Sequence, residues 1–235
     1  MLPPGTENRP GTGAEAVSGA TRFQQFFSAQ TLTPTMPGGA WITGVSFRRD
    51  EEEPRAGEVT FQSVEVILST TDRTVSSVSP VFAENLGPDA GTVYSQGAVH
   101  WTLRSEPGRA NPFDAVIQFP RPFLYDPRNG SLLIDVRLMD ADSFIALDRD
   151  GPNVVPPSVA FYVRGMRGDP PGNLDLSSGY LNGGSYVTQI SFIAIPEPSA
   201  QGLFALGAAA IVLCLRRSPR GPTSQIEGEP YRRIS

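Results

Sequence analysis

Four aspartates that stand close together offer the most direct route to chemistry in this chain. Asp140, Asp142, Asp148 and Asp150 lie in the segment MDADSFIALDRDG. Hard cations such as Ca²⁺ take carboxylate oxygens as ligands, so a loop that carries several of them is a candidate site. The spacing lacks the glycine and the closing glutamate of an EF-hand, so we favour a solvated acidic loop over residues 140–157. Should a calcium site exist, these four aspartates are its candidate ligands, and we expect no other metal or cofactor.

The sequence contains few residues that could form a catalytic site. His100 is the only histidine, and it stands between two apolar residues of a strand-like pattern, so its side chain should face away from theirs. A Ser-His-Asp relay would need this histidine, but the chain has no Gly-x-Ser-x-Gly elbow. Asp114, Glu65 and Asp135 could form the carboxylate pair of a glycosidase, yet nothing in their spacing pairs them. We predict no catalytic residue and no enzyme.

Aromatic side chains could instead stack on sugar rings, as they do in carbohydrate-binding sandwich domains. The candidates are Tyr94, Trp101, Tyr125, Tyr162 and Tyr180. The competing interpretation places most of them in the hydrophobic core. A carbohydrate-binding module is therefore the alternative to a non-enzymatic protein, and a secreted hydrolase comes third.

Composition excludes several functional classes. All 19 basic residues are arginine, which rules out mechanisms that use a Schiff-base or P-loop lysine. The net charge of −5 argues against nucleic acid as a partner. The single cysteine, Cys214, stands in an apolar C-terminal run, so the remainder of the chain can form neither a disulfide nor a thiolate zinc site.

The segments that carry these residues are predicted to form short β-strands. Leu132, Ile134, Val136 and Leu138 give the clearest alternation, with a period of two. The same pattern places Trp41, Thr43, Val45 and Phe47 on one face of another strand, and it predicts inward-facing residues at 64, 66 and 68 and at 99, 101 and 103. A further strand over residues 113–119 should end at Pro120 and Pro122.

About seven or eight such strands, rich turns and no amphipathic helix predict an all-β fold. Two half-apolar sheets must bury their faces on each other, so we expect an antiparallel β-sandwich, and we favour a jelly-roll-like strand order.

A different kind of signal follows the last predicted strand. The sequence Pro196-Glu197-Pro198-Ser199 precedes an uncharged apolar run over residues 200–215, which ends at Arg216 and Arg217. The run is apolar on all sides, and paired arginines are typical of a cytoplasmic flank. We therefore predict a single C-terminal transmembrane helix, with a buried core helix as the alternative for so short a run.

This arrangement resembles the PEP-CTERM sorting signal of bacterial surface proteins. The resemblance implies an exported protein that an exosortase recognises in the inner membrane and cleaves near Pro196-Glu197-Pro198, leaving it at the cell surface or in the extracellular polysaccharide. Residues 200–215 would contact membrane lipid. The segments RFQQFFSAQ, ITGVSFRRD, VEVILSTT and PFLYDPRNGSLLIDVRL are similar to a recurrent type of ectodomain in that family, which has no established activity. Here, unlike in most such signals, a polar tail follows the arginines.

These observations predict four regions. Residues 1–20 form a disordered N-terminal segment, residues 21–195 a β-sandwich ectodomain, residues 196–217 the sorting signal with its helix, and residues 218–235 a disordered polar tail. Residues 1–20 contain no apolar core of a signal peptide. An exported protein needs such a signal, so we expect that the assigned start differs from the true one.

Overall fold

The computed structural model describes residues 8–52, 57–74, 77–106, 109–151, 160–167 and 177–196. They belong to one compact unit, Met1–Pro196, which is separate from a second unit, Glu197–Ser235. All statements below concern the first unit.

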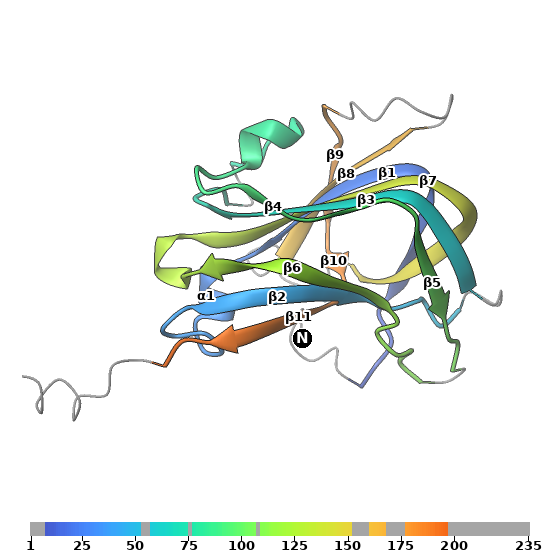
Figure 1. Ribbon diagram of the computed structural model, residues 1–235, viewed down its shortest axis with the longest axis horizontal. Coiled ribbons are helices and arrows are strands. Elements are labelled where there is room, and N and C mark those ends of the chain that lie inside the picture. The colour runs from blue at the N-terminus through green and yellow to red at the C-terminus, as the bar shows by residue number, and fades with distance from the viewer. Residues whose placement is uncertain are drawn as a thin grey trace, which may run out of the picture. The chain divides into compact units, whose positions relative to one another are not determined.

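Antiparallel strands dominate the described residues of this unit, which also contain one short helix and two 3₁₀ turns (Figure 1). In chain order the elements are β1 (Gly13–Phe27), α1 (Ala29–Leu32), β2 (Ala40–Phe47), β3 (Gly57–Thr71), η1 (Phe82–Asn85), β4 (Gly91–Gln96), β5 (Val99–Leu103), β6 (Ala115–Tyr125), η2 (Pro127–Asn129), β7 (Ser131–Asp150), β8 (Ala160–Arg167), β9 (Tyr180–Gly183), β10 (Ser185–Tyr186) and β11 (Thr188–Ala194).

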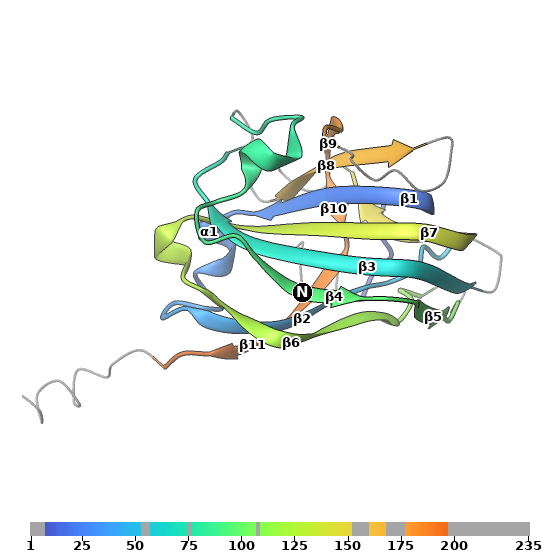
Figure 2. The same cartoon turned by 45° about the horizontal axis from the view of Figure 1, so that its top comes forward.

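The strands form two sheets, which Figure 2 shows as separate layers. The larger sheet has the order β4-β3-β7-β1-β8-β9, with β5 added to β3 and β10 added to β7. The smaller sheet has the order β11-β2-β6, so β11 and β6 are its edges. Every strand pair is antiparallel. This confirms the predicted all-β fold class.

The main hydrophobic core draws side chains from both sheets. The Phe23 ring of β1 lies 4.5 Å from that of Tyr186 and 5.6 Å from that of Phe47, measured between centroids. These contacts connect β1 and β10 of the larger sheet with β2 of the smaller one. The predicted inward residues of the clearest strand are all buried: Leu132, Ile134, Val136 and Leu138.

The predicted acidic loop over residues 140–157 is wrong over its first half. Strand β7 continues to Asp150. β1 pairs with it as far as Arg149, whereas β3 pairs with it only as far as Ala141. Asp140 adopts φ 46°, a left-handed conformation, at a point where the β1–β7 register shifts. Aspartate adopts this conformation more readily than most residues. Beyond this irregularity β1 pairs with β7 as far as Arg149, and β10 pairs with Arg149 and Asp150, so the strand resumes despite its acidic residues.

The N-terminal boundary at residue 20 is also wrong. Strand β1 begins at Gly13, and its first residues pair with the end of β7, for example Gly13 with Arg149 and Val17 with Ile145. The segment has few apolar residues, but Val17 is fully buried in the core. Backbone pairing with β7 holds a segment whose composition suggests disorder.

The predicted single face of residues 41, 43, 45 and 47 does not form. A register shift separates Ile42 from Gly44, so Trp41 is exposed whereas Ile42 and Val45 are buried. Opposite this point, β6 passes through Pro120 and Pro122 rather than ending there. Proline is tolerated in an edge strand at a bulge, because fewer amides are needed for the ladder.

Candidate functional site

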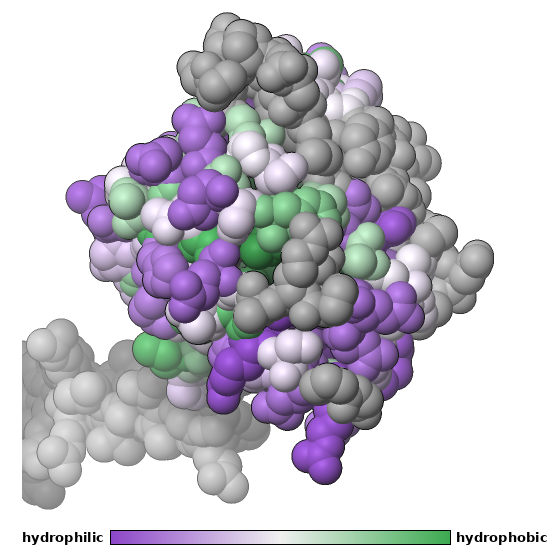
Figure 3. All heavy atoms as spheres, turned by 90° about the vertical axis from the view of Figure 1, so that its right-hand side faces the viewer, coloured by the Kyte–Doolittle hydropathy of each residue, from purple (hydrophilic) through white to green (hydrophobic). Residues whose placement is uncertain are grey.

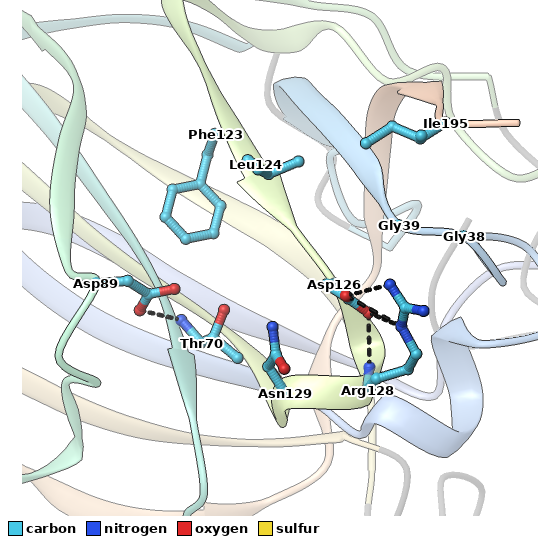
Figure 4. Close-up of a pocket in the computed structure, with 10 residues that line it drawn as sticks. All are labelled: Gly38, Gly39, Thr70, Asp89, Phe123, Leu124, Asp126, Arg128, Asn129 and Ile195. Carbon is cyan, nitrogen blue, oxygen red and sulfur yellow. Dashed lines mark hydrogen bonds and ion pairs between the residues drawn. The ribbon is translucent and has the colours of Figure 1, made fainter. Parts of the chain in front are cut away.

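A cleft of about 600 Å³ opens at one end of the unit, where both sheets and three connections meet (Figure 4). The larger sheet contributes the end of β3 and the β3–β4 connection. The smaller sheet contributes the end of β6, the loop before β2 and the residue after β11. The lining residues are Gly38, Gly39, Thr70, Asp89, Phe123, Leu124, Asp126, Arg128, Asn129 and Ile195.

An ion pair forms one wall of this cleft. Asp126 caps η2 and accepts a hydrogen bond from the Arg128 backbone N–H at 3.0 Å. The Arg128 guanidinium donates to both carboxylate oxygens, with Nε–Oδ1 at 2.9 Å and Nη2–Oδ2 at 2.7 Å. The guanidinium and backbone bonds hold the pKa of Asp126 below its ordinary value. The carboxylate is therefore ionised near neutral pH, and its oxygens already have partners.

The opposite wall combines polar groups with an aromatic ring. Asp89 accepts a hydrogen bond from the Thr70 backbone N–H at 2.7 Å, which ties the β3–β4 connection to the end of β3. In Figure 4 the Phe123 ring lies on the same side of β6 as Asp89 and Thr70, and the Asn129 side chain lies between Thr70 and Arg128. The arrangement offers one ring face and fixed polar groups to a ligand.

The cleft combines apolar surface with a few oriented polar groups. Its two carboxylates accept hydrogen bonds from Thr70 and Arg128. Among the lining residues there is no histidine, cysteine, serine or lysine. Apolar surface with a few oriented polar groups is the usual make-up of a small-molecule pocket.

Figure 3 shows the end of the unit remote from this cleft. Hydrophilic residues, in purple, make up most of its coloured surface, and hydrophobic residues, in green, gather near its centre.

The structure does not bring the four predicted calcium ligands together. Asp148 and Asp150 are buried and held by arginines, with Arg48 Nε–Asp148 Oδ2 at 2.5 Å and Arg9 Nη2–Asp150 Oδ2 at 2.8 Å. Asp142 is exposed and lies at most about 20 Å along β7 from Asp148, with the register shift between Val17 and Gly19 of β1 opposite the stretch between them. The described residues contain no group of three or more His, Cys, Asp or Glu that could hold a metal ion.

The pKa values of Asp142 and Asp148 are shifted in opposite directions. A hydrogen bond from the Thr60 backbone N–H is the main cause that lowers the pKa of Asp142. Burial raises the pKa of Asp148, against the opposing effect of Arg48. Asp140 marks the irregularity within β7 described above. Extended strand geometry, rather than a loop, is the reason that these carboxylates cannot converge.

The three carboxylates considered for glycoside hydrolysis are all paired with arginines. Asp114 pairs with Arg104 at 2.8 Å. Glu65 pairs with Arg137 at 2.8 Å, and the same arginine lies 3.9 Å from Asp135. Asp135 is fully buried on the outer side of β7.

Asp135 has several donors around it. Arg22 donates to both of its oxygens, at 3.0 and 2.6 Å, and Gln24 donates at 2.8 Å. Gln24 also donates to the Phe82 backbone oxygen of η1, and its own side-chain oxygen accepts from Asn85. This network attaches η1 to the outer face of the larger sheet and has a structural role.

His100 is exposed on β5, as its alternation predicted, and its Nδ1 lies 3.2 Å from the Thr60 hydroxyl. The aromatic candidates fall mostly in the core. Trp101 and Tyr125 are buried, and Tyr94 is partly buried against the core cluster. The side chains of Tyr162 and Tyr180 lie outside the described residues. Neither Trp101 nor Tyr125 is available for sugar stacking.

Most of the predicted sorting motif lies outside the described residues. Pro196 is exposed directly after β11, whereas Glu197, Pro198, Ser199, Arg216 and Arg217 are not described. Within the described part of the chain, none of the helices has the length and apolar character needed to cross a bilayer.

Sequence reasoning missed the cleft as a site. Its residues come from five separated segments, and of these only VEVILSTT and PFLYDPRNGSLLIDVRL stood out in the sequence, through their similarity to a recurrent type of ectodomain. Comparison of the chain with protein-family models, curated proteins and solved structures finds no match. The site therefore has to be interpreted from its own geometry.

Proposed function

We propose that this chain is an exported, non-enzymatic cell-surface or extracellular-matrix protein, sorted and cleaved by an exosortase near Pro196-Glu197-Pro198. The observation that carries the proposal is the position of the motif. The compact unit ends at Pro196, and the motif continues from there. Just before the motif, the Ile195 backbone N–H donates a hydrogen bond at 3.0 Å to the backbone oxygen of Gly39, the residue that precedes β2.

This position suits processing by a membrane enzyme. β11 is an edge strand, so the chain leaves the unit at its periphery, and Pro196 is exposed. Cleavage after this point would leave every described strand intact. The proposal includes the finer expectations of a jelly-roll-like strand order, a transmembrane helix over residues 200–215, and an inner-membrane location before release to the surface.

The pairing of the carboxylates with arginines supports the non-enzymatic part of the proposal. Asp114, Glu65, Asp126 and Asp135 are each held by an arginine, and the carboxylate oxygens of Asp126 already accept several hydrogen bonds. For Asp114 and Asp126 these bonds hold the pKa of the carboxyl below its ordinary value, and a carboxyl that stays ionised is a poor proton donor.

Fractionation of the native host followed by intact-mass measurement tests the sorting proposal. A surface or medium form that ends near Pro198 and lacks residues 200–235 is expected. A full-length protein in the inner membrane would show an ordinary tail anchor without exosortase cleavage. A full-length soluble protein in the cytoplasm would refute the proposal.

The cleft favours a second candidate function, the binding of extracellular polysaccharide. A sugar presents an apolar ring face and hydroxyl groups, which match the Phe123 ring and the polar groups of Asp89 and Asn129. Binding of the full-length chain in detergent to a glycan array tests it. Asn129→Ala should abolish the binding, whereas Gln96→Ala, at an exposed position of β4 outside the cleft, should leave it unchanged. Equal binding by both variants would contradict a glycan site here.

A further inference from the structure

Three large apolar side chains form a row across the exposed face of the smaller sheet. Ile193 of β11 pairs with Trp41 of β2, and Trp41 pairs with Leu124 of β6. Directly paired residues point to the same face of a sheet, and neighbouring strands lie about 4.8 Å apart. The side chains are 63%, 42% and 49% exposed, respectively. We call Ile193, Trp41 and Leu124 the apolar ridge.

The core does not require this ridge. Ala40, Ile42 and Tyr125, which are the neighbours of Trp41 and Leu124 along their strands, turn inward and are buried. The register shift after Ile42 is what sends Trp41 outward while Val45 remains inside. Single exposed apolar residues need no explanation, but three in register make a continuous apolar strip across a whole sheet.

The sheet that carries the ridge has almost no charge. β2, β6 and β11 contain no aspartate or glutamate, and their only charged residue is Arg121. The chain as a whole has 24 acidic residues and a net charge of −5. This face can therefore approach an apolar or anionic surface without desolvating a carboxylate, which would be costly.

The ridge is tethered close to the proposed anchor. Ile193 lies in the last strand, and the apolar run begins at Ala200. The six residue steps from Ala194 to Ala200 reach at most about 20 Å when fully extended. If residues 200–215 enter a bilayer, the ridge therefore remains within a short distance of its surface.

We propose that the apolar ridge rests on the lipid headgroup region of the membrane while the chain is anchored. Tryptophan favours this region, because its ring is apolar and its N–H is polar. Ile193 and Leu124 enter the boundary beside it. The contact holds the unit against the membrane and keeps Pro196 near the plane in which an exosortase works. This inference rests on the proposed membrane anchor.

The experiment uses the full-length chain reconstituted in vesicles of phosphatidylethanolamine and phosphatidylglycerol, with and without brominated acyl chains. Bromine quenches tryptophan at close range. The chain has two tryptophans, and Trp101 is buried in the core, so it acts as an internal unquenched reference. We expect a loss of emission in brominated vesicles that Trp41→Phe removes. Ile193→Ser and Leu124→Ser should each reduce this loss.

Val116→Ser is the matched control. Val116 is 50% exposed on β6 but pairs with Ser46, away from the ridge. It should leave the quenching unchanged.

Flotation of the vesicles separates the two proposals. A chain that floats with vesicles but shows no quenching of Trp41 would leave the anchor standing and overturn the ridge contact. A chain that does not float would refute both. Concentration-dependent cross-linking through the ridge, without quenching, would show that a second copy covers it instead and would also overturn the inference.

Discussion

Replacing Asp148 by asparagine should strongly destabilise the compact unit, with or without calcium. Asp148 and Arg48 are 2% and 0% exposed, and the shortest distance between their charged groups is 2.5 Å. The Gly11 backbone N–H also donates to Asp148 at 2.8 Å. Asparagine keeps the shape of the side chain but removes the negative charge that lies 2.5 Å from the buried Arg48 Nε. Breaking a buried pair on one side costs about 3–5 kcal/mol.

The measurement is urea unfolding of the full-length chain in mild detergent with EDTA, followed by tryptophan fluorescence. The expected loss is a large part of the roughly 5–15 kcal/mol that stabilises a typical protein. In thermal unfolding it corresponds to a decrease of about 6–20 °C for a unit of this size. Asp142→Asn is the control, because Asp142 is exposed and accepts its bond at the strand surface. It should change the unfolding free energy far less.

Two results would refute this reasoning. The first is a loss for Asp148→Asn below about 1 kcal/mol, within the range of exposed pairs. The second is a stabilisation of the unmodified chain by Ca²⁺ that Asp148→Asn abolishes, which would restore the calcium interpretation. The double variant Arg48→Met/Asp148→Leu provides a further check. It should recover part of the loss, because an apolar pair of similar volume removes both charges of this buried pair together.

Two further predictions test the core and the ion pairs. Phe23→Ala removes the ring that contacts Tyr186 and should lower the unfolding free energy by about 3–5 kcal/mol in the same urea assay; a loss below 1 kcal/mol would contradict the assigned core. Asp114→Asn should lower stability at neutral pH, because hydrogen bonds from Arg104 lower the pKa of this carboxyl below its ordinary value of 3.8. A lowered pKa stabilises the folded state above the ordinary value, and this contribution is lost as the pH falls through the lowered one. The difference between Asp114→Asn and the unmodified chain should therefore vanish in strong acid, and a difference that persists there would contradict the assignment.

Local patterns were sufficient for most of the strands. The alternation of Leu132, Ile134, Val136 and Leu138 predicted a buried strand face, and the structure confirms it. The position of His100 between inward-facing neighbours likewise predicted its exposure. A period of two identifies a strand with one buried face, because successive side chains point to opposite sides.

Local sequence patterns gave wrong predictions where pairing with a neighbouring strand determined the structure. Trp41 lies outside because of a register shift against β6, and residues 13–20 are ordered because β7 pairs with them. Asp148 belongs to a strand because β1 lies beside it. In each case the deciding hydrogen bonds come from residues far away in the sequence, which no local window contains.

The sequence by itself determined the all-β class, the inward face of several strands and the resemblance of the C-terminal segment to a sorting signal. Composition, alternation and a short linear motif carry that information. Only the tertiary structure decided that Asp148 pairs with an arginine, that the cleft draws residues from five segments, and that Ile193, Trp41 and Leu124 form one ridge. Sites of this kind depend on strand register and sheet order, which are set by long-range pairing and core packing rather than by any single stretch of the chain.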